Sequence, residues 1–183
     1  MAEPNEISLV LTPDAADAQC RETVKQARNA SHALAALIAL QSFIAATAHP
    51  SHRHTPAYET VKAVVEKHAA EIRTRLIAES AGTLAETIRQ RDPLEIARIH
   101  AALSRNGFWQ AAQQAMARLQ ADELAGAAEW AKDWCLNAKS RAQAASGFPD
   151  ALDFRKAGIP AAEYAAMTEI NHYLAGEAKL GQN

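Results

Sequence analysis

The stretch TPAYETVKAVVEKHAAEIRTRLIAESAGTLAETIRQRDPLE, residues 55–95, starts and ends on the same helix-initiating signal. Thr55-Pro56 and Asp92-Pro93 each place a good N-cap residue before a proline suited to a first helical turn. Glu59 and Glu95 follow, where an acid interacts favourably with the helix dipole. Between the two signals, one stripe recurs at spacings of three and four residues and then continues: Tyr58, Val61, Val65, His68, Ile72 and Leu76, followed by Ile77, Ala81, Leu84 and Ile88. The stretch therefore predicts one long helix from Pro56 to about residue 91.

Similar helix-start and helix-stop signals divide the rest of the chain. Thr12-Pro13 predicts a helix over residues 13–48, and Asp92-Pro93 predicts one that ends at Asn106-Gly107. A further helix is expected over residues 108–145. Gly147-Phe148-Pro149 and Gly158-Ile159-Pro160 are two copies of one stop signal, a glycine, an apolar residue and a proline. They isolate a short helix over residues 150–157 and a last one over residues 160–175.

Alanine dominates the composition, with 44 of 183 residues, and it is the best helix former. The sequence predicts an all-α fold, an elongated bundle of about four long helices with two short C-terminal helices packed at one end. We expect a tail over 1–12, a long-helix bundle over 13–146 and a C-terminal appendage over 147–183, folding as one unit. Alanine-faced helices with few large side chains favour self-association, so a homo-oligomer, most simply a dimer, is expected.

Charge, cysteine content and hydropathy argue against several classes of protein. A net charge of −2 argues against a general nucleic-acid coat. Cys20 and Cys135 lie far apart and form no zinc or disulfide pattern, which favours a reducing cytoplasm. The acidic start of the chain is unlike a signal peptide. The longest apolar run, residues 33–48, is shorter than a membrane span and interrupted by Gln41, so it is interpreted as a buried central helix.

Residues 77–91 resemble the helix-turn-helix of bacterial repressors, because Ala78, Gly82 and Ile88 have the matching spacing. The resemblance implies a DNA-reading face that would include Thr87, Arg89, Gln90 and Arg91. The alternative is a continuous helix with one tolerated glycine, and the lack of a proline between Pro56 and Pro93 favours it.

A second resemblance, over residues 58–124, is to the phasins, alanine-rich helical proteins that coat polyester storage granules. It rests on the Arg91-Asp92-Pro93-Leu94-Glu95-Ile96 junction and on the Gln-rich and Ala-rich helix after it, with Gln110, Gln113, Gln114 and Leu119. The resemblance implies a granule-surface protein.

Metal and catalytic motifs are weak. His49, His52 and His54 are candidate metal ligands, although a solvated connector is the simpler interpretation. Glu169-x-x-His172 has the spacing of di-iron bundles, but the sequence holds no second such pair. His68 lies on an apolar stripe and is expected to be a core histidine with one hydrogen-bond partner. With no nucleophile motif either, we expect no cofactor and no enzyme activity.

Trp130 and Trp134 lie four residues apart on one predicted helix, and tryptophan is enriched at binding hot spots. They are the candidate contact for a protein partner. The competing interpretation packs them against Phe148, Phe154 or Tyr164. The leading hypothesis is a non-enzymatic cytoplasmic interaction protein, of adaptor, chaperone or inhibitor type, from a GC-rich bacterium or its phage or plasmid. A DNA-binding regulator is the alternative, and a phasin-like granule protein is the third.

Overall fold

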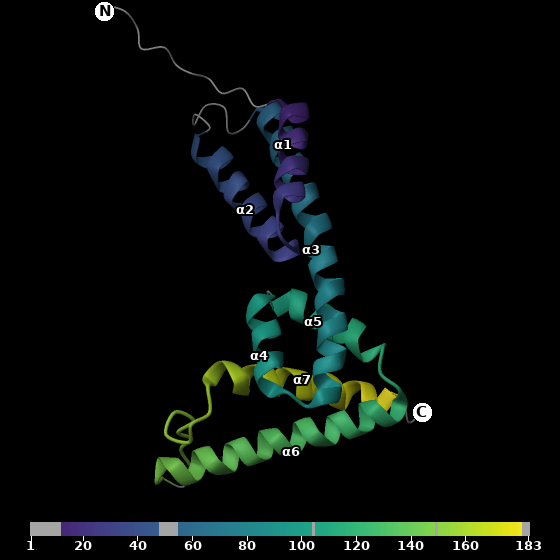
Figure 1. The fold of residues 1–183 in the computed structure, drawn as a ribbon. Helices are drawn as coiled ribbons and strands as arrows, with labels where there is room; N and C mark the ends of the chain where they lie inside the picture. The colour runs from purple at the N-terminus through teal and green to yellow at the C-terminus, as the bar shows by residue number, and fades with distance from the viewer. Residues whose placement is uncertain (1–11, 48–54, 104, 149, 181–183) are drawn as a thin grey trace, which may run out of the picture. The chain divides into compact units, whose positions relative to one another are not determined.

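The computed structural model describes residues 12–47, 55–103, 105–148 and 150–180. These residues form seven helices and no strand, which confirms the all-α prediction (Figure 1). The helices are α1 Pro13–Gln26, α2 Ala30–Thr47, α3 Pro56–Gln90, α4 Pro93–Ala102, α5 Arg105–Met116, α6 Ala121–Ser146 and α7 Ala161–Leu180.

Three of the proline signals form the predicted N-caps. The Thr12 hydroxyl accepts a hydrogen bond from the Ala15 backbone N–H at 3.2 Å, and the Thr55 hydroxyl accepts one from the Tyr58 backbone N–H at 3.3 Å. The Asp92 carboxylate accepts the N–H groups of Leu94 and Glu95 at 3.0 and 3.1 Å. Each cap satisfies backbone donors that the helix cannot pair internally, so α1, α3 and α4 begin where the sequence predicts.

The predicted helix over residues 13–48 is wrong, because the chain breaks between α1 and α2. Ala27 has extended backbone, and the Asn29 side chain accepts the N–H of His32 at 2.9 Å. Asparagine is among the best N-cap residues, and here it starts a new helix.

The predicted helix over residues 108–145 is also wrong. α5 already starts at Arg105, so Asn106-Gly107 lies in its first turn rather than at a helix end. The helix then stops at Met116, and α6 starts at Ala121. Between them, the Glu123 carboxylate accepts the Gln120 N–H at 2.8 Å, which caps the start of α6.

The predicted short helix over residues 150–157 is a single turn. Asp153 caps it by accepting the Lys156 N–H at 2.9 Å, and Gly158 ends it with a left-handed φ of 68°. The Ile159 N–H donates to the Phe154 carbonyl at 2.8 Å, which closes the turn as a Schellman motif. α7 then runs to Leu180, beyond the predicted end. Among the described residues, seven helices thus stand in place of the predicted four long and two short ones.

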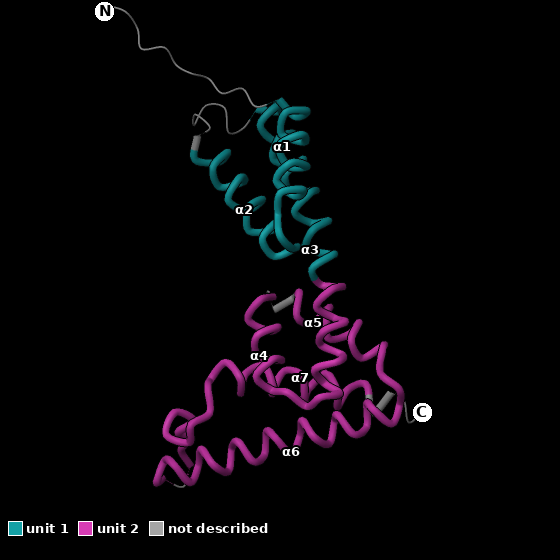
Figure 2. Tube along the Cα trace, viewed as in Figure 1, with its two compact units in different colours: residues 1–76 teal, residues 77–183 magenta. Residues whose placement is uncertain are grey.

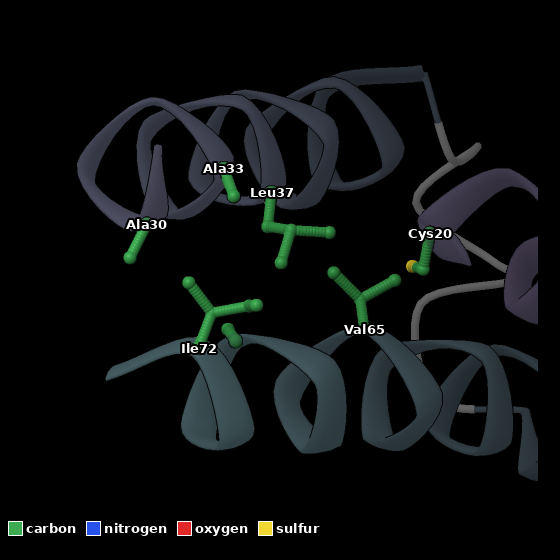
Figure 3. Close-up of a cluster of buried hydrophobic side chains, with 7 residues drawn as sticks. Cys20, Ala30, Ala33, Leu37, Val65 and Ile72 are labelled. Carbon is green, nitrogen blue, oxygen red and sulfur yellow. The ribbon is translucent and has the colours of Figure 1, made fainter. Parts of the chain in front are cut away.

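The chain packs into two compact units, residues 1–76 and 77–183, and the boundary falls inside α3 (Figure 2). We call them unit 1 and unit 2. In unit 1, Leu37 of α2 faces Val65 of α3, with Cys20 of α1 beside them (Figure 3). Only three of the seven buried residues in this cluster have large side chains, namely Leu37, Val65 and Ile72.

Unit 2 is organised around α7, which packs against α4, α5 and α6. Its largest fully buried side chains come from four helices, α3, α4, α5 and α7: Leu84, Ile88, Ile96, Phe108, Met167, Ile170 and Leu174. The stop signal at Gly147 also forms, since this glycine caps α6 with a left-handed φ of 73°. None of the described helices is both long enough and apolar enough to span a membrane.

Candidate partner-binding groove

Trp130 and Trp134 of α6 lie outside the core of unit 2. Both indoles are half-buried and line an open groove of about 350 Å³. We call it the indole groove, and its lining is Arg91, Gly126, Glu129, Trp130, Asp133, Trp134 and Asn137. Two side chains four apart on a helix share a face, so both indoles line the same groove.

The buried face of α6 explains this position. It consists of small residues only, Ala127, Ala131, Cys135, Ala138 and Ala142. Small side chains allow α6 to approach its neighbour α7 closely, which leaves no space for an indole between the helices. The two tryptophans therefore flank the packed face instead of filling it.

The alternative packing partners of the tryptophans have other surroundings. Phe148 is 71% exposed, and the Phe154 and Tyr164 rings stack on each other with centroids 4.2 Å apart. Trp134 also borders a second cavity of about 180 Å³, whose lining includes Gly158, Ile159 and Pro160. The C-terminal turn thus lies beside one end of the tryptophan pair and does not bury it.

Arg91, the residue after α3, also lines the groove. Its φ of 57° is left-handed, a conformation that usually requires glycine. The Asp92 N–H donates to the Thr87 carbonyl and the Arg91 N–H to the Ile88 carbonyl, both at 3.2 Å, which is the Schellman pattern. The guanidinium lies near Gly126, where an added Cβ would be 3.9 Å from Nη2.

The three charged side chains that line the groove make no polar contact with the described residues of the chain. Among the residues that the structure describes, the side chains of Arg91, Glu129 and Asp133 form no ion pair or hydrogen bond. The neighbouring Arg89 differs, since its Nε lies 2.9 Å from Oε1 of Glu123. That hydrogen bond, together with the Gln120 N–H, lowers the pKa of the Glu123 carboxyl.

The helix-turn-helix prediction is wrong in its central feature, because α3 continues through Gly82 without a turn. Thr87 is only 4% exposed, and its hydroxyl donates to the Thr83 carbonyl at 2.8 Å. Gln90 donates to the Glu86 carboxylate at 3.0 Å. With Arg89 paired and Arg91 in the indole groove, the four candidate DNA contacts do not form one free reading face.

Gly82 has a packing role that sequence reasoning missed. A Cβ at this position would lie 2.8 Å from Nη1 of Arg118, whose Nη2 donates to the Ala78 carbonyl at 3.5 Å. The glycine therefore admits an arginine from the α5–α6 connection against the side of α3. Only the fold brings these residues together, since Arg118 lies far along the chain.

The histidine predictions have mixed outcomes. His49, His52 and His54 lie outside the described residues, and the described part of the chain holds no cluster that could bind a metal. As expected, His68 is half-buried with a close partner, its Nε2 lying 2.7 Å from Oδ1 of Asp17. This contact is the main cause that lowers the pKa of Asp17.

Glu169 links helices instead of pairing with His172 around a metal. Its carboxylate lies 2.9 Å from Nε2 of His100 on α4 and accepts the Tyr173 hydroxyl at 2.7 Å. Burial raises the pKa values of both cysteine thiols, Cys20 and Cys135, which opposes formation of a reactive thiolate.

Comparisons with protein-family models, with curated proteins and with solved structures found no match to this chain. The function is therefore argued from the groove itself. The phasin-like segment, residues 58–124, is divided between the two units at residue 76.

Proposed function

We propose that this chain is a non-enzymatic, cytoplasmic interaction protein, of adaptor, chaperone or inhibitor type, that binds a protein partner in the indole groove. The observation that carries the proposal is the position of Trp130 and Trp134, half-buried along an open groove instead of inside the core. Tryptophan supplies much binding energy when a partner removes its remaining surface from water.

The charges around the indoles support a protein ligand. Glu129 and Asp133 contribute carboxylates from α6 to the groove lining, while Arg91 contributes a guanidinium from the end of α3. A protein segment that combines apolar side chains with charges of both signs complements this surface. A nucleic-acid backbone does not, because the two carboxylates would repel its phosphates.

The left-handed backbone conformation of Arg91, which costs free energy, also supports a partner-binding role for the groove. A non-glycine residue in the left-handed region costs on the order of 1 kcal/mol, and such strain concentrates at functional sites. The conformation is stabilised by the Schellman hydrogen bonds, and the side chain then lines the groove. We assign Arg91 the role of pairing with an acidic group of the partner.

Affinity capture from native lysate tests the groove. The double variant Trp130→Ala/Trp134→Ala should lose the captured protein, whereas Trp109→Ala should retain it. Trp109 is the matched control because it is 43% exposed on α5 and does not line the groove. Circular dichroism must show that both variants keep their helices.

Two results would overturn this assignment. Unfolding of the double variant would mean that the indoles are required for folding. Capture that disappears after nuclease treatment would favour the DNA-binding alternative, since the bound molecule would then be a nucleic acid.

We also propose that the protein is a homo-oligomer, most simply a dimer. The support is the thin core of unit 1, where only three large side chains of the cluster are buried and the large side chains packed around them stay partly exposed: Val24, Leu34, Leu40, Ile44 and Leu76. Domains with so little buried apolar surface commonly gain stability by association.

A further inference from the structure

A repeated pair of residues forms much of the indole groove, because an acid precedes each tryptophan. Glu129-Trp130 and Asp133-Trp134 lie four residues apart on α6, and all four side chains line the groove. Each of two successive helical turns therefore contributes one carboxylate and one indole to the same lining. Lys132 lies between the two pairs in the sequence but does not line the groove.

The charged lining of the groove favours a cation. It holds two carboxylates and one guanidinium, so negative charge is in excess. Glu129 and Asp133 are both exposed, and neither forms an ion pair with the described residues of the chain. Like charges four residues apart on a helix repel each other, because their Cβ atoms are only about 5 to 6 Å apart. A cation bound between the two carboxylates removes this repulsion.

The two indoles add a second attraction for positive charge. An aromatic ring carries negative charge on its faces, and tryptophan is the side chain that attracts cations most strongly in this way. Trp130 and Trp134 are only half-buried, so part of each side chain stays available to a ligand. Among the cations of proteins, a guanidinium is planar and weakly hydrated, stacks on aromatic rings and pairs with carboxylates through several N–H groups.

We infer that the indole groove binds an arginine side chain of the partner protein, with its guanidinium at the two indoles and paired with Glu129 and Asp133. The inference rests on the proposed function and names the chemistry of the partner at that same site. Charge complementarity selects this occupant, because an apolar side chain would leave both carboxylates without a counter-ion.

The position of Arg91 adds a second requirement for the bound segment. Its Nη2 lies near Gly126, and Asp133 is seven residues further along α6, which is about 10 Å at the rise of an α-helix. An extended chain covers this distance in about three residues. The partner therefore carries an acid, for Arg91, about three residues from its arginine.

A second cavity favours a chain segment over a small free cation. Trp134 and Asn137 line both the indole groove and the neighbouring cavity of about 180 Å³. A bound segment can therefore continue past the indoles along α6. Glu163 of α7 lines that second cavity and supplies a further carboxylate there.

Nuclear magnetic resonance of the ¹⁵N-labelled full chain tests the inference, since the sequence holds three tryptophans and therefore three indole N–H groups. The probe is the blocked peptide Asp-Ala-Ala-Arg-Ala-Ala-Asp, which offers an acid three residues to either side of its arginine. A twin peptide replaces the arginine with citrulline, a neutral side chain of nearly the same shape. Trp109 is the internal control, because it does not line the groove.

We expect the arginine peptide to shift the indole signals of Trp130 and Trp134 and to leave that of Trp109 in place. Such a short probe should bind with a dissociation constant of about a millimolar or below, and at least about tenfold more tightly than its citrulline twin.

A charge-removal variant tests the role of the carboxylates. Glu129→Gln/Asp133→Asn keeps the side-chain shapes and both indoles, so its preference for the arginine peptide should fall below about twofold. Glu177→Gln is the matched control, because Glu177 is exposed on α7 and does not line the groove. The control should keep the full preference.

The outcomes separate the inference from the proposed function. Equal binding of the two peptides, or no shift of either groove indole at millimolar peptide, would overturn the arginine assignment. Full preference for arginine in the charge-removal variant would overturn it as well. If the partner captured from lysate is lost in Trp130→Ala/Trp134→Ala while the two peptides bind equally, only the arginine assignment fails. A double tryptophan variant that still captures its partner would overturn the groove and the assignment together.

Discussion

Unit 1 and unit 2 are built from similar alanine-rich helices, yet they bury very different amounts of apolar surface. The cluster in unit 1 combines three large side chains with three alanines and a cysteine. In unit 2, α7 is contacted by three other helices, and Met167, Ile170 and Leu174 on it are fully buried. Alanine-rich helices form a substantial core only where one helix is enclosed, because alanine itself removes little area from water.

The exposed surfaces of the units differ in the same way. Unit 1 exposes an uncharged helix face, whereas unit 2 exposes two indoles surrounded by charges of both signs. A surface with charges of both signs can select a partner through charge complementarity, which an uncharged face cannot do.

The largest expected effects come from truncating the two cores. Leu37→Ala in unit 1 and Ile170→Ala in unit 2 should each cost about 2 to 5 kcal/mol, because both side chains are fully buried. In the thin core of unit 1, we expect this loss to unfold the unit. Hydrogen exchange should then show loss of protection in α1 and α2 of Leu37→Ala, while α7 stays protected.

The reciprocal variant is the control. Ile170→Ala should lower protection in α4, α5 and α7 and spare α1 and α2. If Leu37→Ala removed protection from α7 as well, the two units would fold as one cooperative structure, as the sequence analysis expected.

A smaller effect is expected at Gly82, in the helix that both units share. Gly82→Ala should stabilise the protein by up to about 1 kcal/mol, because alanine is the better helix former. The clash with Arg118 involves the flexible end of that side chain, which can move away. Urea unfolding followed by circular dichroism measures the change. Substantial destabilisation would instead mean that the Arg118 guanidinium cannot move away from the added methyl group.

The smallest expected effect is on the dependence of folding stability on low pH. The contact with His68 lowers the pKa of Asp17 in unit 1, and the Arg89 hydrogen bond lowers that of Glu123 in unit 2. A carboxyl with a lowered folded-state pKa stabilises the fold above its unfolded pKa, about 3.9 for Asp and 4.3 for Glu. That stability is lost as the pH falls through the folded value.

Unfolding measured between about pH 5 and pH 2 checks the sign. Asp17→Asn should flatten the acid dependence of unit 1 alone, and Glu123→Gln that of unit 2 alone, as resolved by hydrogen exchange. An unchanged slope in both variants would mean that these pairs do not contribute, because exposed ion pairs are strongly screened.

Several features of the fold could be predicted because their causes lie within one helical turn. Asp92 caps α4 through N–H groups two and three residues away, and Gly158 ends its turn as the stop signal indicated. The break at Asn29 could have been found by the same capping argument. The continuous α3 followed from the lack of a helix-breaking residue. The arrangement around the candidate site could not be predicted in this way, because Trp130 and Trp134 have the same helical spacing whether they lie in the core or on the surface.

The sequence by itself therefore determined that this protein is all-α, where three of its helices start, and that Trp130 and Trp134 share a face. Tertiary structure decided which faces are covered. It placed Arg91 in a groove whose other residues lie 35 or more positions further along the chain, and it left one side of α2 exposed. The physical reason is that helix formation depends on nearby residues, whereas burial depends on distant helices that are brought together only on folding.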